Sequence, residues 1–266
     1  MSILTTDQGS VHYEVYGRGK PVILLHGWLG SWGLWQQTMA DLGTSYRTYA
    51  LDFWGFGESG KKRETYAVQD FVSLVDQFME QLGIERAPLV GHSMGGTVSL
   101  SVAMSYPQRV AKVAVAGSPI AGSSLAPLLK LAGYRPVAFF LFNLMGPFRA
   151  WMKYFYSPRI CSDPRFPAMM DRDLSRTTLE SFLVSIASLR KTDLTRCLDQ
   201  VHVPVLGLYG DKDRVVDPLQ WQPLERGAER AQIARFPTAG HFMMLENPTE
   251  FSQILKRFLD EPLPPS

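Results

Sequence analysis

The chain has 266 residues, of which 45% are apolar and 20% charged, and its formal net charge is only +2. This composition is typical of a soluble globular protein and excludes an intrinsically disordered chain. The lysines and arginines are scattered along the sequence rather than clustered, so we expect no nucleic-acid partner. The length suits one large α/β domain, or one domain with a sizeable insertion.

Localisation is indicated by cysteine usage and by the apolar segments. Cys161 and Cys197 are too few for a disulfide framework and lie outside any Cys-x-x-Cys arrangement, as is usual in a reduced, intracellular setting. The first residues have neither the basic start nor the apolar run of a signal peptide. The most apolar segment, VAFFLFNLMG at 137–146, is half as long as the span of about twenty residues that crosses a membrane. We therefore expect a cytoplasmic protein without stable membrane insertion, and the sequence leaves its oligomeric state open.

Short β-rich runs recur along the chain and predict strands at 11–16, 22–26, 47–52, 87–92, 110–117, 203–210 and 231–237. Several are continuous Val, Leu and Ile stretches, as expected for strands buried on both faces of a parallel sheet. Between them, residues 65–83 and 249–260 repeat apolar side chains on one helical face. Gly83 suits the end of the first helix. Asn247, Pro248 and Glu250 suit the start of the last one, as N-cap, first-turn proline and capping-box acid.

Alternating strands and helices predict right-handed crossovers and a three-layer α/β sandwich. The alternation stops between residues 118 and 198, where no buried-strand pattern is found and the segment is expected to be helical or irregular. We therefore predict a core made of residues 1–117 and 199–266, with a helical cap inserted at 118–198.

The stretch LVGHSMGGTVSL at 89–100 surrounds one serine with three glycines. It lacks the lysine of a phosphate-binding P-loop, and its glycine spacing does not fit a dinucleotide-binding loop. It does match Gly-x-Ser-x-Gly, with a strand before it and a helix after it. In that geometry the serine, Ser93, lies on a tight, strained turn, and Gly91 and Gly95 provide the space. The alternative is a purely structural glycine-rich turn. The N-terminus of the following helix would favour developing negative charge beside the serine.

A serine hydroxyl needs a base to become a useful nucleophile. Of the five histidines, His12 and His202 adjoin predicted strands and are interpreted as structural. His92 is next to the serine, but neighbouring side chains diverge on so tight a turn, and His26 closes another strand. His241, in a loop between a strand and the last helix, is the one free to reach a site at the strand ends, and we predict it as the base.

Three aspartates in LYGDKDRVVDP are candidates for the acid that orients this base. Asp217 precedes Pro218 and fits a helix N-cap, and Asp211 follows a glycine as turn-forming aspartates commonly do. Asp213 is three residues past the glycine that ends the strand, and we favour it as the acid. Ser, Asp and His then follow one another in the order of a single known fold.

With these motifs the sequence resembles the α/β-hydrolase family over nearly its whole length outside the cap. The motifs are LLHGWLGSWGLW, LDFWGFGESG, LVGHSMGG, and the pair GDKD and AGHF. The resemblance is greatest to capped esterases and hydrolases, a group that includes carboxylesterases, meta-cleavage-product hydrolases, epoxide hydrolases and haloalkane dehalogenases. It implies a mostly parallel eight-stranded sheet with the cap over the C-terminal ends of the strands.

The same resemblance assigns roles. Ser93 would be the nucleophile, His241 the base and Asp213 its orienting acid, and the backbone amides of Trp28 and Met94 would form the oxyanion hole. Epoxide hydrolases and dehalogenases have an aspartate at the nucleophile position, so the serine here excludes those two chemistries. The loop DFWGFGES at 52–59 is interpreted as structural, with Asp52 holding it by hydrogen bonds.

The predicted activity is hydrolysis of carboxylic esters with apolar acyl or aryl groups, through an acyl-enzyme. Alternatives are cleavage of a C–C bond in a vinylogous diketone or cofactor-free perhydrolysis by the same triad, and a catalytically silent ligand-binding protein. No cofactor is needed, and no His/Cys cluster has metal-ligand spacing. The aromatic stretch at 139–156 is either pocket wall, cap core or a surface for transient lipid contact. As pocket residues the sequence suggests Trp28, Phe139, Phe142, Met145, Trp151 and Phe242.

Overall fold

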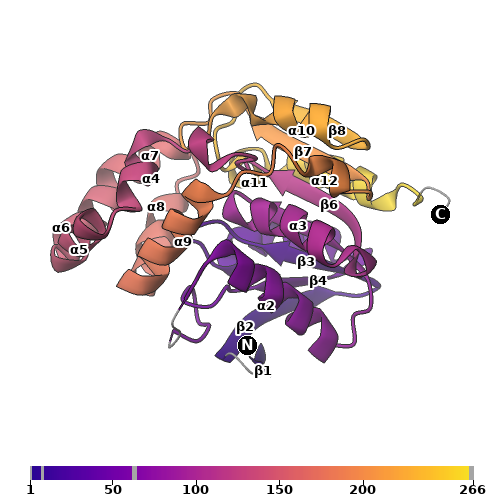
Figure 1. Cartoon of the computed structure of the whole chain (residues 1–266), viewed down its shortest axis with the longest axis horizontal. Helices are drawn as coiled ribbons and strands as arrows, with labels where there is room; N and C mark the ends of the chain where they lie inside the picture. The colour runs from indigo at the N-terminus through magenta and orange to yellow at the C-terminus, as the bar shows by residue number, and fades with distance from the viewer. Residues whose placement is uncertain (1, 7–8, 62–64, 264–266) are drawn as a thin grey trace.

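A twisted eight-stranded sheet forms the centre of the computed structural model, which describes residues 2–6, 9–61 and 65–263 (Figure 1). Its strand order is β1-β2-β4-β3-β5-β6-β7-β8. The strands are β1 (Ser2–Thr6), β2 (Gly9–Gly17), β3 (Lys20–Leu25), β4 (Tyr46–Leu51), β5 (Ala87–His92), β6 (Val110–Ala116), β7 (Val205–Gly210) and β8 (Ala231–Phe236). β2 runs antiparallel to β1 and to β4, and every other neighbouring pair is parallel, which confirms the predicted mostly parallel sheet.

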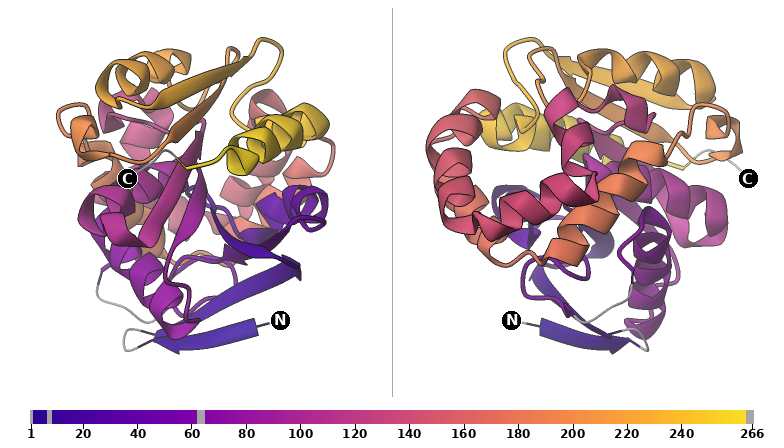
Figure 2. Two further views of the ribbon diagram at one scale, coloured as in Figure 1. Left: turned by 90° about the vertical axis from the view of Figure 1, so that its right-hand side faces the viewer. Right: turned by 60° about the vertical axis from the view of Figure 1, so that its left-hand side comes forward.

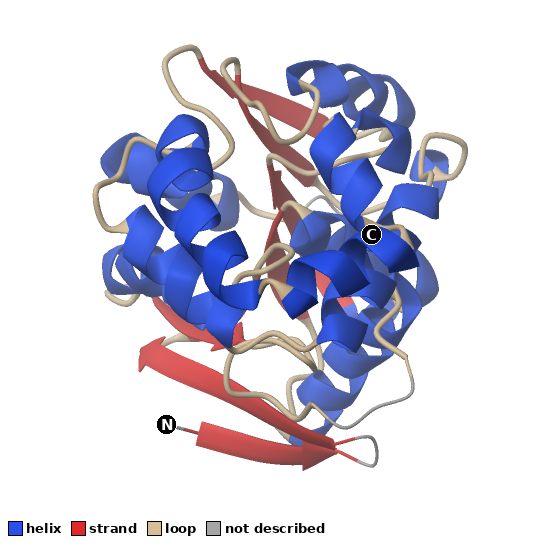
Figure 3. Ribbon diagram, turned by 90° about the vertical axis from the view of Figure 1, so that its left-hand side faces the viewer, coloured by secondary structure: helices blue, strands red, loops and turns tan. Residues whose placement is uncertain are grey.

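Helices cover both faces of this sheet (Figure 3). The α-helices are α1 (Gln36–Leu42), α2 (Val68–Gln81), α3 (Met94–Ser105), α4 (Pro127–Ala132), α5 (Arg135–Asn143), α6 (Met145–Trp151), α7 (Ser157–Ile160), α8 (Phe166–Ser175), α9 (Leu179–Lys191), α10 (Trp221–Gly227), α11 (Met243–Glu246) and α12 (Pro248–Asp260). α2 packs beside α3 on one face, and α1 packs beside α12 on the other (Figure 2). In the described part of the chain, no helix is long and apolar enough to cross a membrane.

The core is built by continuous apolar strands, as the sequence predicts. The four residues from Val22 to Leu25 of β3 are fully buried, as are Val113 and Val115 of β6, because helices cover the sheet on both sides. α2 ends at Gln81 and is followed by Gly83 in a left-handed conformation, with φ of 64°. This glycine therefore ends the helix as predicted.

Residues 118–198 contain α4 to α9 and a π-helical turn at Met152–Tyr156, and all eight strands lie outside this segment. Figure 1 shows these helices together at one end of the molecule, with α5 and α6 farthest from the sheet. Two isolated bridges hold this segment: Ala121 pairs with Asp193 and joins its two ends, and Leu125 pairs with Val216 of the core.

Two local features differ from the predictions. β1 was not expected, because its few residues lack a clear apolar alternation and its strand conformation depends on pairing with β2. Asn247 is the N-cap residue of α12 as predicted, but its side chain makes no cap hydrogen bond and the expected capping box with Glu250 does not form. The reason is that α11 ends immediately before it: the Asn247 N–H donates to the Met243 carbonyl, and a ψ of 57° is not the extended conformation from which an N-cap side chain bonds to the helix. Pro248 does occupy the first turn as predicted.

Candidate active site

Ser93 lies between the end of β5 and the start of α3, at the C-terminal edge of the parallel strands. Its φ of 50° and ψ of −118° are strained for a residue with a side chain. Among the non-glycine residues that the structure describes, only Leu29 also has a positive φ, of 58°. Both strained residues border the same small cavity. Strain of this kind persists where the surrounding structure enforces it, and it clusters at functional sites.

The glycines of this turn allow the backbone to pack closely. A Cβ placed on Gly91 would lie 2.2 Å from the carbonyl oxygen of Gly95. A Cβ on Gly95 would lie 2.3 Å from the carbonyl oxygen of Leu25, at the end of the neighbouring strand β3. Because both contacts are with backbone, a side chain at either position could be accommodated only by moving a strand or the turn itself.

The Gly95→Ala substitution is therefore expected to lower the free energy of unfolding by about 3 kcal/mol. Gly146→Ala is the matched control, because Gly146 lies in α6 and a Cβ there has no neighbour within 4 Å. That control should leave stability unchanged or raise it by about 0.5 kcal/mol. Urea unfolding of the two variants measures the difference, and equal stability would contradict the steric role of Gly95.

His241 and Asp213 form a buried pair. The distance from His241 Nδ1 to Asp213 Oδ2 is 2.7 Å, and each side chain is no more than 3% exposed. The other carboxylate oxygen, Asp213 Oδ1, accepts hydrogen bonds from the backbone N–H groups of Val215 and Val216. Three donors thus hold the carboxylate, and it in turn fixes the orientation of the imidazole ring and leaves Nε2 for other partners.

The other two aspartates of the same loop have different partners. Asp211 forms an ion pair with Arg235 on the surface. Asp217 accepts a hydrogen bond from the Leu219 N–H and so caps a short 3₁₀ turn, as the sequence predicts. Of the three candidates, only Asp213 contacts a histidine.

The other four histidines are His92, His26, His12 and His202, and none of them is paired with Asp213. His92 Nε2 lies 3.0 Å from the carbonyl oxygen of His241, so this ring supports the loop of the other histidine. Burial, with a contribution from the neighbouring His241, holds the His92 pKa well below its usual range, so the ring stays neutral. His26 Nε2 accepts a hydrogen bond from the Phe53 N–H, and His12 Nδ1 lies 2.8 Å from Asp52 Oδ2. His202 is exposed in a loop.

The two backbone segments predicted for an oxyanion hole border the serine. Met94 is the first residue of α3, so its N–H has no acceptor within the helix. Gly27 packs so closely against the turn that a Cβ there would lie 3.0 Å from Ser93 Cβ. The backbone leading to Trp28 therefore passes directly beside the serine, and Trp28 lines the same small cavity as Ser93 and His241.

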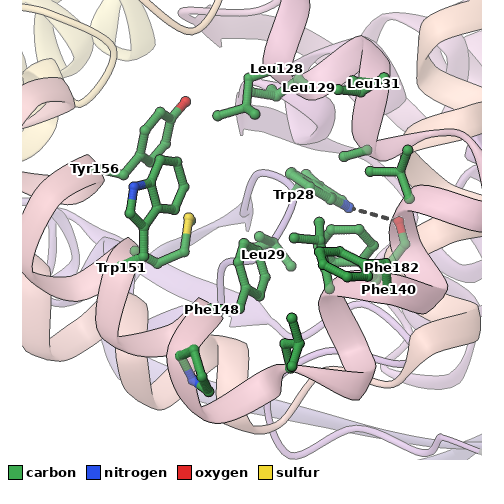
Figure 4. Close-up of a pocket in the computed structure, with 16 residues that line it drawn as sticks. Trp28, Leu29, Leu128, Leu129, Leu131, Phe140, Phe148, Trp151, Tyr156 and Phe182 are labelled. Atoms are coloured by element: carbon green, nitrogen blue, oxygen red, sulfur yellow. Dashed lines mark hydrogen bonds between the residues drawn. The ribbon is translucent and has the colours of Figure 1, made fainter.

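A much larger cavity, of about 370 Å³, adjoins this small one and lies among the helices of residues 118–198 (Figure 4). The two cavities share five lining residues: Trp28, Leu29, Leu129, Met152 and Tyr156. No charged side chain lines the larger cavity among the residues that the structure describes. Trp28 is held in the wall by a hydrogen bond from its indole N–H to the Phe182 carbonyl and by contact of the two rings.

Of the six predicted pocket residues, three line a cavity and three do not. Trp28 and Trp151 line the large cavity, and Phe242 lines the small one. Phe139 is 60% exposed, Phe142 packs edge-on against Phe182, and Met145 packs partly buried against the core; none of the three lines either cavity. Residue type alone suggests these three, and it carries no information on helical phase, which decides the side of a helix that faces the cavity.

The cavity wall instead comes from a different set of positions. Phe140, Leu144 and Phe148 line it at four-residue spacing, so they share one side of consecutive helical turns. That spacing is visible in the sequence. Phe182 and Tyr156 had no such signal, because they reach the cavity only through the packing of α9 and of the π-helical turn. Burial, with a contribution from Asp213, raises the pKa of Tyr156 to about 12, so its phenol stays protonated.

The loop 52–59 is held as predicted. Asp52 accepts hydrogen bonds from the backbone N–H groups of Trp32 and Glu58, and Gly55 and Gly57 have positive φ. Trp32 N–H brings the segment after β3 to the same carboxylate. Asp52 thus anchors both loops beside the site, without lining either cavity itself.

Comparison with known proteins agrees with this architecture. A family model described as "alpha/beta hydrolase fold" matches residues 20–248. Among the similar curated proteins, the pimeloyl-[acyl-carrier protein] methyl ester esterase of Vibrio campbellii is 30% identical over 218 residues, which cover 78% of this chain and 82% of the relative. The 2-hydroxy-6-oxononadienedioate/2-hydroxy-6-oxononatrienedioate hydrolase of Paraburkholderia phymatum is 30% identical over 267 residues, which cover 94% and 91%.

Solved structures are similar over almost the whole chain. The bromoperoxidase from Bacillus anthracis has a TM-score of 0.81 and 25% identity, covering 95% of this chain and 96% of that one. The enol-lactonase from Burkholderia xenovorans has a TM-score of 0.83 at 20% identity, covering 98% and 100%, and shares the fold. The sheet, the family model and these relatives agree: the chain belongs to the α/β-hydrolase family.

Proposed function

We propose that this chain is a serine hydrolase that cleaves carboxylic esters with apolar acyl or aryl groups. The observation that carries the proposal is that three residues border one small cavity: the strained Ser93, His241 with its partner Asp213 behind it, and Trp28. A nucleophile, an oriented base and backbone donors at a helix N-terminus are the parts that acyl transfer requires.

In the proposed mechanism, the Ser93 hydroxyl attacks the ester carbonyl and His241 Nε2 takes its proton. The oxyanion is stabilised by the N–H groups of Met94 and Trp28, and the alcohol leaves with the proton that His241 returns. Water, deprotonated by the same histidine, then attacks the acyl-enzyme and releases the acid. The reaction draws its nucleophile, base and oxyanion donors from the chain itself, so the proposal calls for no metal or cofactor.

The large cavity supports an apolar acyl group rather than a charged one. Its wall consists of aliphatic and aromatic side chains, and it adjoins the cavity that contains Ser93. A dienedioate, the substrate type in the name of the Paraburkholderia phymatum relative, has two carboxylates. A wall without a basic side chain would leave these carboxylates unpaired, which is costly on burial. We therefore place ester hydrolysis ahead of cleavage of such a dianion.

The test is a series of p-nitrophenyl esters from acetate to octanoate. Each methylene buried in an apolar cavity contributes about 0.8 kcal/mol, so kcat/KM is expected to rise about fourfold per added methylene. A kcat/KM that falls between butyrate and octanoate would contradict the assignment of the cavity.

A variant that fills the cavity sharpens this test. Val137 lines the large cavity but not the small one, so Val137→Trp should lower kcat/KM for octanoate by more than about tenfold, the loss of two to three buried methylenes. Activity on acetate should be retained. Ala150→Trp is the control, because Ala150 is exposed on α6 and lines neither cavity. If both variants behave alike, the acyl group does not occupy this cavity.

A further inference from the structure

The outer surface of the cap helices is unusually apolar. Thirteen large hydrophobic side chains are exposed in the described residues, and nine of them lie between residues 128 and 155. Five of the nine also line the large cavity and so surround its opening: Leu128, Leu131, Phe140, Leu144 and Trp151. We call these five the cavity rim. Exposed apolar side chains gathered in this way mark an interaction site, whereas single ones are ordinary.

The other four side chains continue this surface beyond the rim. Tyr134, Phe139, Tyr154 and Phe155 are each more than half exposed and line neither cavity. Tyr134 precedes α5, Phe139 lies in it, and Tyr154 and Phe155 lie in the π-helical turn after α6. α4, α5, α6 and the π-helical turn contact one another in sequence. Figure 1 places α5 and α6 at the end of the molecule that is farthest from the sheet. A flat partner could therefore reach these side chains without touching the core.

The charge of the same segment has one sign. Residues 118–162 contain five cations, Lys130, Arg135, Arg149, Lys153 and Arg159, and no aspartate or glutamate. From outside the segment, Asp171 contacts Arg149 and Lys153, and Glu246 accepts hydrogen bonds from Ser162. Two carboxylates against five cations leave an excess of positive charge. Arg135 and Arg159 are exposed next to the apolar side chains. Exposed Trp, Phe and Leu among Lys and Arg form the pattern of helices that bind in the interface of a membrane.

From these observations we infer that the cap docks, reversibly and without spanning, on the surface of an anionic lipid bilayer through the cavity rim and its neighbours. The rim would then open toward the acyl region of the bilayer, and an amphiphilic ester would enter the cavity without crossing water. This delivery step rests on the proposed function, but the docking itself does not. A second copy of the chain is a less suitable occupant, because a symmetric dimer would bring two positively charged surfaces together.

Vesicle flotation tests the docking. The full chain is expected to float with vesicles of phosphatidylcholine and phosphatidylglycerol, to bind pure phosphatidylcholine at least tenfold more weakly, and to lose binding as salt is raised. Absence of binding to the anionic vesicles would overturn the inference. So would equal binding to both vesicle types.

Two double variants separate the apolar and the charged contributions. Phe139→Ser with Phe155→Ser removes apolar side chains that line neither cavity, and should weaken binding on the order of 100-fold. Arg135→Gln with Arg159→Gln should weaken it about 30-fold, since each cation near the surface contributes about fivefold.

Matched controls remove exposed apolar or cationic side chains from the sheet domain instead. Ile3→Ser with Leu219→Ser removes exposed apolar side chains, and Arg226→Gln with Arg230→Gln removes exposed cations. Both controls should bind anionic vesicles as the parent chain does. If they weaken binding as much as the cap variants, docking does not occur through the cap.

Activity and association state complete the test. All four double variants should hydrolyse soluble p-nitrophenyl butyrate at the parent rate, whereas the two cap variants should lose activity on an ester embedded in anionic vesicles. If the parent chain hydrolyses no soluble ester, the proposed function fails while flotation still reports on docking. A dimer in sedimentation velocity that becomes monomeric in Phe139→Ser with Phe155→Ser would show that a second copy covers this surface, and would overturn the inference.

Discussion

The Ser93→Ala variant is expected to lose esterase activity by about 10⁴- to 10⁶-fold in kcat while its KM for an apolar ester changes little. Alanine removes the only atom that would form the acyl-enzyme bond, but it leaves the large cavity and the His241–Asp213 pair in place. The loss should therefore fall on the chemical step rather than on binding. Steady-state kinetics with p-nitrophenyl butyrate measures both quantities.

Ser101→Ala is the matched control for this variant. Ser101 lies on the same helix, α3, and its hydroxyl bonds back to the Thr97 carbonyl, away from the small cavity. Its removal should leave kcat within about twofold, as is usual for a substitution away from the reacting groups. Substantial activity in Ser93→Ala, or a comparable loss in Ser101→Ala, would contradict the assignment of the nucleophile.

The Asp213→Asn variant should lose about 10⁴-fold in kcat while it folds normally. The N–H groups of Val215 and Val216 both point at Asp213 Oδ1, so an asparagine would place its carbonyl oxygen there. Its NH₂ group would then face His241 Nδ1 as a donor. The imidazole would then adopt the tautomer that carries its proton on Nε2. Because Nε2 must accept the proton of Ser93, this tautomer could not act as the base.

Asp211→Asn provides the comparison, because Asp211 lies two positions away but pairs with Arg235 on the surface. That variant should keep its kcat, since a surface ion pair contributes only about 0–1 kcal/mol to stability and nothing to the proposed proton transfer. Kinetics together with thermal unfolding of both variants checks the claim. An inactive Asp211→Asn beside an active Asp213→Asn would reverse the roles of the two carboxylates.

Most of the sheet could be predicted from the sequence because its central strands are continuous apolar runs, and their burial on both faces leaves little ambiguity. β1 was missed because its conformation depends on a partner strand rather than on its own pattern. The missing cap bond of Asn247 has a similar reason. Asn247 holds the N-cap position that its residue type favours, but α11, immediately upstream, sets its backbone.

The positions proposed for catalysis were accessible from the sequence because each is marked by a short-range rule. Gly91 and Gly95 mark a tight turn around Ser93, and Gly210 marks the strand end from which Asp213 is counted. No short-range rule of this kind predicts which residues form the cavity wall. Phe182 and Tyr156 reach it by the packing of helices far apart in the sequence, and Phe139 was chosen although it faces outward. Composition alone does not fix which side of a cap helix faces inward.

The most direct test of Ser93 as the nucleophile is covalent labelling with a fluorophosphonate followed by peptide mass spectrometry. We predict one adduct, on Ser93, formed rapidly in the parent chain, strongly slowed in His241→Ala and absent in Ser93→Ala. Labelling of a different residue, or no labelling of a chain that still hydrolyses p-nitrophenyl butyrate, would contradict it.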